Sequence, residues 1–401
     1  MEIFELSRVN RFVLDKHHLT NDSRIDDIIQ ITDNICGLHS TRLTTSYLSL
    51  FERTNNFQKT DFERELYINR TLGRVRGMRR TLFIHTRDMI PIIYAATCKL
   101  NEKYVEKYME FHKISLSEYQ EISKKIINIL KGRELSAPEI RKELDSKSNI
   151  PAIIHLMCNY GLLIRGKPIR DWKDHRNKYV LFKEYFTNID LNIVNEKQAI
   201  AILVEKYLKA YGPASENDIS WWTGLTKTEI REALHYIESG INKIKISSIK
   251  GTFLIFNSDI QKLYDINNID YPSLSLLPEL DPYPMGYKNR DRYINANNYN
   301  KIFDRSGNIT ATIFLDGIAV GVWDTEKKPE SIIKFHLFHS IEKNLLDELY
   351  SKAKKIGKFL FDENVQIIEC DSMIPLTERT AGGFISPLKY YQKQVESNRR
   401  L

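Results

Sequence analysis

The chain has 401 residues and a net charge of +7, with 42% hydrophobic and 28% charged residues, a composition typical of a folded protein. It contains no run of about 18 apolar residues and begins with a polar segment, so we expect no membrane span, no signal peptide and a cytoplasmic, nucleoid-associated location. Four scattered cysteines without CxxC spacing argue against a zinc ribbon and against a disulfide framework.

The N-terminal region is predicted to be mainly helical. Isoleucines fall on one helical face over residues 25–35, after cap candidates at residues 21–23, and Gly37 is a stop signal. A second apolar helix follows this corner. The letters RRTLFIHT, residues 79–86, predict a strand, and a long helix begins near Asp88.

The next two regions repeat one pattern, with starts roughly 80 residues apart. In each region, three helices precede two short strands that flank a basic turn. Ser136 and Glu139 have capping-box spacing in the first region. Ser215 and Asp218 form a similar pair in the second. Three helices followed by a two-stranded wing are typical of the winged helix, a relative of the helix-turn-helix.

The C-terminal region changes to an α+β pattern. Asp316-Gly317 lies between two apolar runs, which predicts a β-hairpin, and a further strand and an amphipathic helix follow. The fold class is therefore predicted as mainly α, with tandem winged-helix repeats and an α+β C-terminal part that contains an antiparallel sheet. The predicted units are a helical or winged-helix unit that carries the corner after Gly37 (1–110), two winged-helix units (111–190 and 191–270) and the α+β region (271–401).

Basic side chains gather on the predicted wings and turns. A single cluster of this kind is commonly a solvated face, but several clusters on a helix-turn-helix architecture favour contacts with phosphates of nucleic acid. The candidates are Arg42, Arg76, Arg79, Arg80, Lys167, Arg170, Lys173, Arg176, Lys245, Lys250, Lys288, Arg290 and Arg292.

The stretch NICGLHSTRLTTSYLSLFERT, residues 34–54, places His39, Ser40 and Thr41 between two apolar helices. Two interpretations are open. The hydroxyl residues are reasonable N-caps for the second helix, with the histidine bonded to a backbone carbonyl. Alternatively, the corner is a catalytic site.

Five segments resemble successive blocks of the AlkZ/YcaQ family of winged-helix DNA-binding-domain proteins. They are GLHSTRLTTSYLSLFERT, GMRRTLFIHTRDM, AYGPASENDISWWTGL, LLPELDPYPMGYKNRDR and FDRSGNITATIFLDGIAVGVW. The blocks occur in the family's order and cover most of the chain, from about residue 5 to 385. The resemblance implies winged-helix units around a DNA-sized cleft, in DNA glycosylases that excise bulky N7-alkylated purines and unhook interstrand crosslinks.

In that family the glycine-led corner carries a Gln-x-Gln or Gln-x-Asp pair that places the hydrolytic water. The pair falls on His39 and Thr41, so this chain departs from the family pattern at both positions. A neutral histidine can accept a proton from water and a threonine hydroxyl can hold a water, so the pair is chemically workable. Asp281 matches an aspartate of the family. It is a candidate to stabilise the cationic sugar or support His39, or, alternatively, to cap an Asx turn.

We therefore predict a monofunctional DNA glycosylase that hydrolyses the N-glycosidic bond of N7-alkylated purines in double-stranded DNA. It is expected to act as a monomer, with no metal or organic cofactor. His39 is the predicted base or water holder, Thr41 its partner and Asp281 a supporting carboxylate. The alternative is a non-catalytic, regulatory winged-helix DNA-binding protein, and a protein-interaction scaffold is a third.

Overall fold

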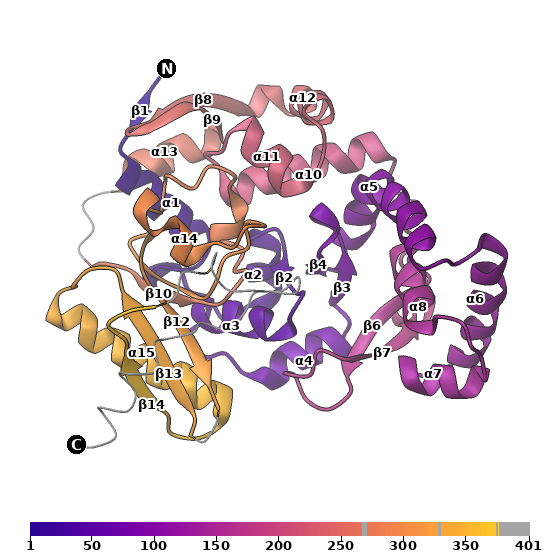
Figure 1. Ribbon diagram of the computed structural model, residues 1–401. Helices are drawn as coiled ribbons and strands as arrows, with labels where there is room; N and C mark the ends of the chain where they lie inside the picture. Colours follow the sequence, from indigo (N-terminus) through magenta and orange to yellow (C-terminus); the bar gives the residue numbers. More distant parts are fainter. Residues whose placement is uncertain (267–270, 328–329, 374–375, 377–401) are drawn as a thin grey trace.

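The computed structural model describes residues 1–266, 271–327, 330–373 and 376. Over these residues the chain has a mixed helical and sheet fold, with three three-stranded sheets and one five-stranded sheet. Figure 1 shows the course of the chain.

The N-terminal region consists of helices around one small antiparallel sheet. Its elements are α1 (Leu6–Lys16), α2 (Ile28–Asn34), β2 (Leu38–His39), α3 (Leu43–Arg53), α4 (Lys59–Tyr67), β3 (Leu72–Arg76), β4 (Leu82–Thr86) and α5 (Met89–Phe111). The predicted strand and the predicted long helix are confirmed as β4 and α5. The cap predicted at residues 21–23 is wrong, because α2 begins later and the Asp27 side chain accepts the backbone N–H groups of Ile29 and Gln30. The sheet order is β2-β4-β3.

The second region has its own small sheet and core. Its elements are α6 (Leu116–Leu130), β5 (Leu135–Ser136), α7 (Ala137–Leu144), α8 (Ile150–Asn159), β6 (Leu163–Pro168), β7 (Asn177–Leu181) and α9 (Phe182–Tyr185). The predicted capping box is confirmed, since Glu139 accepts bonds from the backbone N–H and the hydroxyl of Ser136. Val105 of α5 joins the core of this region, so α5 connects it to the N-terminal region.

The third region repeats the order of three helices, two hairpin strands and a final helix, while its third strand comes from the N-terminus. Its elements are α10 (Glu196–Tyr211), α11 (Glu216–Thr223), α12 (Lys227–Tyr236), β8 (Ile241–Ile246), β9 (Ile249–Phe256) and α13 (Asn257–Asp265). The predicted pair of Ser215 and Asp218 is confirmed as a capping box. The N-terminal strand β1 (Ile3–Phe4) runs parallel to β8 and completes the sheet β1-β8-β9.

The C-terminal region is built on the five-stranded sheet β10-β11-β12-β13-β14. Its elements are β10 (Leu274–Leu277), α14 (Tyr299–Ile302), β11 (Thr312–Leu315), β12 (Ile318–Glu326), β13 (Ile332–Leu337), α15 (Lys343–Phe361) and β14 (Gln366–Glu369). The predicted hairpin is confirmed, because Asp316 and Gly317 have φ of +49° and +79° between two antiparallel strands. The sheet is not wholly antiparallel: β14 pairs parallel to β13, as the long crossover through α15 allows.

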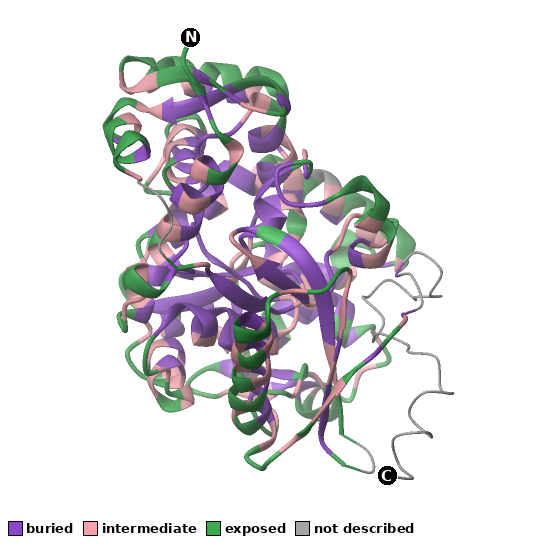
Figure 2. Cartoon of the chain, turned by 90° about the vertical axis from the view of Figure 1, so that its left-hand side faces the viewer, coloured by how far each residue is buried: buried purple, intermediate pink, exposed green. Residues whose placement is uncertain are grey.

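Two large cores join regions that are distant in the sequence. One contains Phe12 of α1 together with Trp222 of α11, and the other contains Tyr47 of α3 together with Phe335 of β13. The N-terminal region therefore shares its core with the third and C-terminal regions. Figure 2 shows buried residues along the strands at the centre and exposed residues on the outward faces of helices.

The corner after Gly37 lies near the middle of this arrangement. Figure 1 shows β2, β3 and β4 between the C-terminal sheet on one side and α6, α7 and α8 on the other. Among the residues that the structure describes, no helix combines the length and the apolarity needed to cross a membrane.

Candidate functional site

The chain turns sharply between α2 and β2, and this turn requires a glycine. Gly37 has φ of +101°, and its N–H bonds the carbonyl oxygen of Thr32 at 2.8 Å. A Cβ at this position would lie 2.5 Å from Cε1 of His85 on β4, so a larger residue would push the strand away. The stop signal predicted at Gly37 is thus confirmed, and it directs the chain onto the sheet.

His39 is a buried, neutral imidazole. It pairs with Phe83 across β2 and β4, and the two rings meet edge to face at 5.2 Å. Its side chain is 3% exposed, and Nδ1 has no hydrogen-bond partner within the described chain. Burial lowers the pKa of His39 to about 3, with the charges of Arg79 and Arg74 lowering it further. The ring can therefore accept a hydrogen bond at neutral pH without carrying a positive charge.

The helix-cap interpretation of this corner is wrong. Arg42 is the N-cap residue of α3 and makes no side-chain capping bond. The Ser40 hydroxyl is buried without a partner in the described structure, and the half-buried Thr41 hydroxyl forms no hydrogen bond with a described residue. The hydroxyl groups are thus not used to satisfy the backbone of α3, although helix N-termini usually recruit such groups.

Arg74 of β3 holds the backbone of the corner. Its Nε and Nη2 donate to the carbonyl oxygen of Ser40 at 3.0 and 2.6 Å, and Nη2 also reaches the carbonyl oxygen of Thr41 at 3.3 Å. Nη1 donates to Oδ1 of Asn177 on β7 at 2.8 Å. The side chain is buried, so this cation connects the corner directly to the second region.

Asp281 is not placed to contact a substrate, and its predicted role as a supporting carboxylate at the corner is wrong. It is 0% exposed and forms a double hydrogen bond with Arg53, from Nη1 to Oδ2 at 2.8 Å and from Nη2 to Oδ1 at 2.7 Å. The Ser49 hydroxyl donates to Oδ2 at 2.7 Å. The alternative Asx turn is confirmed, since the N–H of Tyr283 donates to Oδ1 at 3.0 Å.

Glu279 is the carboxylate joined to the corner, and the sequence analysis missed it. Nη1 of Arg42 lies 3.0 Å from its Oε1. Burial raises the pKa of Glu279, the Arg42 charge opposes this and the Asp324 charge adds to it. The three residues line a cavity of about 240 Å³ that also contains Thr45 and Trp323. The segment ELDPYP contains two acids, Glu279 and Asp281, and so indicated a carboxylate at this place. The sequence alone does not decide which of the two is joined to the corner and which is buried.

A strained arginine turn stands beside the corner. The 3-10 turn η2 (Met78–Arg80) connects β3 to β4, and Arg79 and Arg80 have φ of +49° and +59°. The guanidinium of Arg79 lies 4.0 Å from the ring centroid of Trp221 on α11, and burial lowers its pKa to about 10. Left-handed non-glycine residues are strained, and such strain is concentrated at functional sites.

Comparisons with known proteins identify the family and the fold of the chain. A family model for the DNA glycosylase AlkZ-like proteins matches residues 32–359, which include the corner, the arginine turn and Glu279. The chain belongs to the AlkZ-like DNA glycosylase family. Among solved structures, the DNA glycosylase AlkZ of Streptomyces sahachiroi is similar to it, with a TM-score of 0.74. The alignment covers 92% of this chain and 99% of that chain at 14% identity, so it shows a shared fold. Comparison with curated proteins gives no match.

Two of the basic residues predicted to contact DNA are buried in this AlkZ-like chain, and the prediction for them is wrong. Arg290 lies 3.5 Å from the ring centroid of Phe303 and donates to the carbonyl oxygen of Gly307 at 2.7 Å. Arg292 lies 3.8 Å from the ring centroid of Tyr287 and is 2% exposed. Arg292 also donates to the carbonyl oxygen of Pro213 at 3.0 Å, so it joins the C-terminal region to the third region. Both arginines can be buried in this way because their charge is delocalised over a flat group that stacks on aromatic rings.

The predicted basic residues of the first wing differ in their availability. Lys167 and Arg170 are exposed. Lys173 donates to the carbonyl oxygen of Leu360, and Nη2 of Arg176 forms an ion pair with Asp174 at 2.9 Å. Lys167 and Arg170 are therefore better placed than the other two to meet phosphates.

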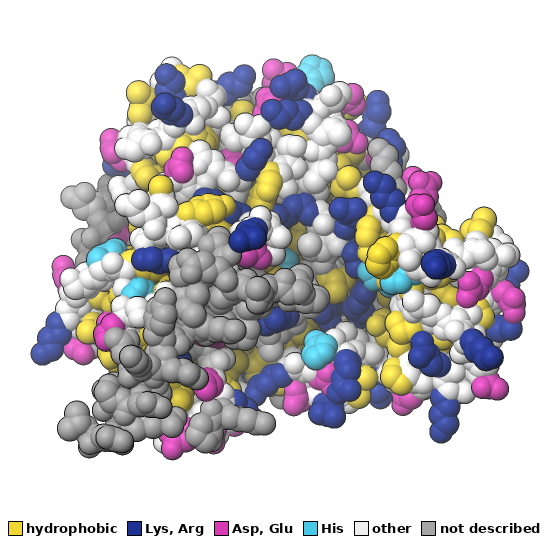
Figure 3. Space-filling view, in the orientation of Figure 1, with side chains coloured by type: hydrophobic (Ala, Val, Ile, Leu, Met, Phe, Trp, Pro, Cys, Tyr) yellow, Lys and Arg dark blue, Asp and Glu magenta, His cyan; other side chains and the backbone are white. Residues whose placement is uncertain are grey.

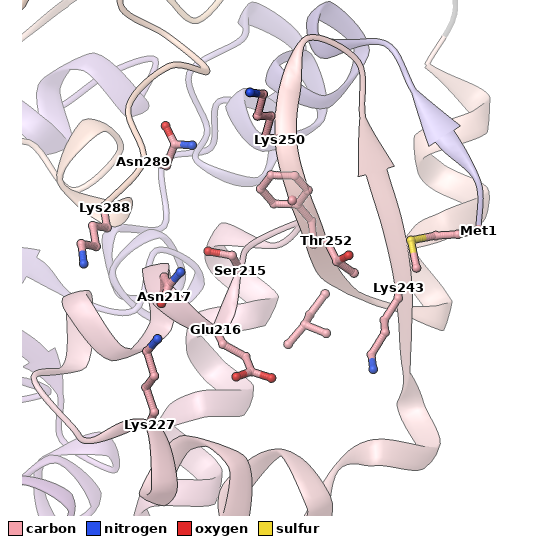
Figure 4. A pocket seen from close by; sticks show the side chains of 13 residues that line it. Met1, Ser215, Glu216, Asn217, Lys227, Lys243, Lys250, Thr252, Lys288 and Asn289 are labelled. Atoms are coloured by element: carbon pink, nitrogen blue, oxygen red, sulfur yellow. The ribbon is translucent and has the colours of Figure 1, made fainter.

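The second wing of this AlkZ-like chain borders a basic cavity of about 730 Å³. Figure 4 shows Lys243 on β8, Lys227 at the start of α12 and Lys288 around it. Lys250, near the start of β9, also lines it, and none of the four lysines forms an ion pair with a described residue. The acidic lining residue Glu216 is paired with Arg231 at 3.1 Å. The predicted Lys245 is exposed on β8 but does not line the cavity.

The sequence predicted only some of the residues that line the basic cavity. Lys250 and Lys288 were predicted, but Lys227 was not, because a lysine at the first turn of a helix carries no pattern of its own.

The described residues contain no group of three or more His, Cys, Asp or Glu side chains arranged to hold a metal ion.

Proposed function

We propose that the chain is a monofunctional glycosylase that hydrolyses the N-glycosidic bond of N7-alkylated purines in double-stranded DNA and unhooks crosslinks of that type. The observation that carries this proposal is the neutral His39, two residues before a Thr41 whose hydroxyl forms no hydrogen bond with a described residue, at the corner where the family resemblance expects the water-placing pair. The cap interpretation would have explained these residues without chemistry, and the structure contradicts it.

The reaction needs little acid catalysis, but it requires a water held close to C1′ of the sugar. An N7-alkylated purine is cationic, so the electron pair of the breaking C1′–N9 bond neutralises the departing base. The sugar becomes oxocarbenium-like, and the oxygen of a water bonds to C1′ while its proton leaves to His39 or to solvent. A protonated His39 would repel the cationic sugar. Its burial and the nearby Arg79 and Arg74 keep the ring neutral, which suits it to orient water as a hydrogen-bond acceptor.

Arg74 and Glu279 have positioning roles in this proposal. Arg74 fixes the carbonyl groups of Ser40 and Thr41 and so sets the direction of both proposed side chains. Glu279 takes the place that the sequence analysis gave to Asp281. It is joined to the corner through Arg42 and supplies negative charge on the side of α3.

We also infer that the second and third regions are winged-helix units. In each, three helices precede a two-stranded hairpin, and a short extra strand, β5 or β1, completes the sheet. This supports the predicted units 111–190 and 191–270. We keep residues 1–110 as the proposed N-terminal unit, although this unit shares its hydrophobic core with the third and C-terminal regions.

Double-stranded DNA is the proposed partner, bound by a monomer in the nucleoid. Arg80, Lys167, Arg170, Lys250 and Lys288 are exposed cations on turns and wings, as phosphate contacts require. Arg76 and Arg79 are half-buried and lie on aromatic rings, so they would act closest to the corner.

The second candidate function is a non-catalytic, regulatory DNA-binding protein. One observation favours it: a pKa of about 3 makes His39 a weak base. A regulator of this kind dimerises on two half-sites, whereas the glycosylase acts as a monomer on a lesion.

Release of 7-methylguanine from methylated duplex DNA tests the proposal, with binding to the same duplex measured in parallel. We expect excision by the wild type and a decrease of about a hundredfold or more in His39→Ala with binding retained. The control is His339→Ala, an exposed histidine after β13 that should behave as wild type. Binding without release, on methylated and on crosslinked duplexes, would support the regulator instead.

A further inference from the structure

A series of aromatic rings follows one side of α5. Tyr104, Tyr108 and His112 are four residues apart, so they lie on the same face of the helix. Neighbouring ring centroids are 5.3 Å apart for the first pair and 4.3 Å apart for the second. All three side chains are half-buried, which leaves part of each ring at the surface.

His155 of α8 fixes these rings in place. Its ring stacks on Tyr108 with centroids 4.5 Å apart and planes inclined by 13°. Burial lowers the pKa of His155 to about 3, and the charges of Arg76 and Arg165 add to this effect. The neutral ring can therefore accept a hydrogen bond from the Tyr104 hydroxyl, whose oxygen lies 3.0 Å from Nε2. We call Tyr104, Tyr108, His112 and His155 the aromatic shelf.

Three arginines without carboxylate partners surround the aromatic shelf. The guanidinium groups of Arg76 and Arg80 lie 5.6 and 5.2 Å from the ring centroid of Tyr104. Arg165 of β6 is close enough for its charge to act on His155. Within the described part of the chain none of the three forms an ion pair, whereas Arg176 and Arg231 do. Figure 3 shows Lys and Arg side chains beside histidine and hydrophobic or tyrosine side chains along the recess next to α5.

The aromatic shelf lies within reach of the corner. Arg76 ends β3 and pairs with Leu82 on β4, and the next residue of β4, Phe83, pairs with His39 on β2. Two strand spacings of about 4.8 Å therefore separate Arg76 from His39 across the sheet, roughly 10 Å in total. The distance from the Arg76 backbone to His39 corresponds to about three base steps of 3.4 Å, and the rings of the shelf lie beyond Arg76.

We propose that the aromatic shelf stacks an unpaired DNA base a few nucleotides from the lesion, while the surrounding arginines hold its phosphates. Unpaired cations next to rings fit a nucleotide, which offers an anion and a flat π surface together. Bases inside a duplex are already stacked on each other, so the shelf selects a base that has left the stack. The inference rests on the proposed function for the position of the lesion, but not for the binding chemistry.

The test uses unmodified DNA, so that binding is measured without excision. A duplex with one bulged 2-aminopurine is compared with the fully paired duplex of the same sequence. We expect the full-length protein to quench the bulged 2-aminopurine and to bind the bulged duplex more tightly. Tyr108→Ala should reduce that preference on the order of tenfold, and Tyr108→Phe should keep it, because stacking needs the ring and not the hydroxyl.

The matched control is Tyr271→Ala, since Tyr271 is 79% exposed and lies between α13 and β10, away from α5 in the chain. It should leave the preference unchanged. A wild type that neither quenches the bulged base nor prefers the bulged duplex would overturn the proposal, even if Tyr108→Ala does not fold. So would a folded Tyr108→Ala protein with the wild-type preference. Loss of 7-methylguanine release with the shelf intact would count against the proposed function alone.

Discussion

Arg74 donates two hydrogen bonds to the carbonyl oxygen of Ser40, at 3.0 Å from Nε and 2.6 Å from Nη2. A buried cation thus fixes the backbone between the two residues proposed to place water. The same side chain bonds Asn177, so the position of the corner depends on how β3 meets β7. Arg74 is therefore a residue that positions the site, whereas His39 and Thr41 are the residues proposed to act in it.

Replacing this anchor should slow excision more than it weakens binding. Arg74→Lys keeps a charge but cannot reproduce the fork of donors, so the corner is expected to shift. A misplacement of about 1 Å can reduce a rate by about a hundredfold. Single-turnover release of 7-methylguanine would measure it, with Arg141→Lys, at an exposed arginine of α7, as the control. A wild-type rate in a correctly folded Arg74→Lys would contradict the positioning role.

The pH dependence of excision tests the neutral state of His39. Its pKa is lowered to about 3, so it stays unprotonated from pH 8 down to about pH 4. Protonation at still lower pH would add a positive charge beside a cationic sugar and stop the reaction. We therefore expect single-turnover rates that do not change between about pH 5.5 and 8, since an ordinary histidine would titrate near 6.5. A rate that falls tenfold per pH unit below pH 6.5 in the wild type, but not in His39→Gln, would show instead that the pKa of His39 is not lowered.

His39→Gln is also informative at a single pH. Glutamine is a neutral side chain that orients water, and it is the residue the family resemblance places at this position. If His39 orients water, the glutamine variant should keep the rate within about tenfold, while His39→Ala loses a hundredfold or more. Equal losses in both variants would show that proton acceptance by the imidazole is essential.

Asp281 should prove structural. Asp281→Asn leaves Arg53 buried without its counter-charge, and breaking such a pair costs about 3–5 kcal/mol. We expect a marked decrease in the melting temperature, with excision by the folded fraction retained at temperatures where the variant is intact. Thermal unfolding and release of 7-methylguanine at low temperature would measure the two effects. If Asp281→Asn kept the stability of the wild type but lost excision, Asp281 would have a catalytic role after all.

The basic cavity beside the second wing should contribute to the salt dependence of DNA binding. Replacing Lys227, Lys243, Lys250 and Lys288 with glutamine removes four exposed cations. Each lost phosphate contact should reduce the slope of log K against log salt by about 0.9. A matched control replaces Lys343, Lys354, Lys355 and Lys358, four exposed lysines of α15, and changes the net charge equally. An equal effect of both sets would mean that only net charge matters.

Local patterns in the sequence determined several turns, two capping boxes and the approximate order of elements. Gly37, the pair Ser136 and Glu139, and Asp316-Gly317 were identified correctly, because their conformations depend on neighbouring residues. The blocks of family resemblance also identified the corner that carries His39. These features need no knowledge of distant parts of the chain.

The tertiary structure alone decided which charged residues are available for function. Asp281 lies 228 positions from Arg53, and their pairing removes a predicted site residue from the surface. Arg290 was predicted to meet DNA, but Phe303 and the loop at Gly307 bury it. An isolated charge is costly to bury, so the sequence alone suggests that every such residue is exposed. Burial becomes favourable only when a partner from elsewhere in the fold satisfies the charge, and that partner appears only once the chain has packed.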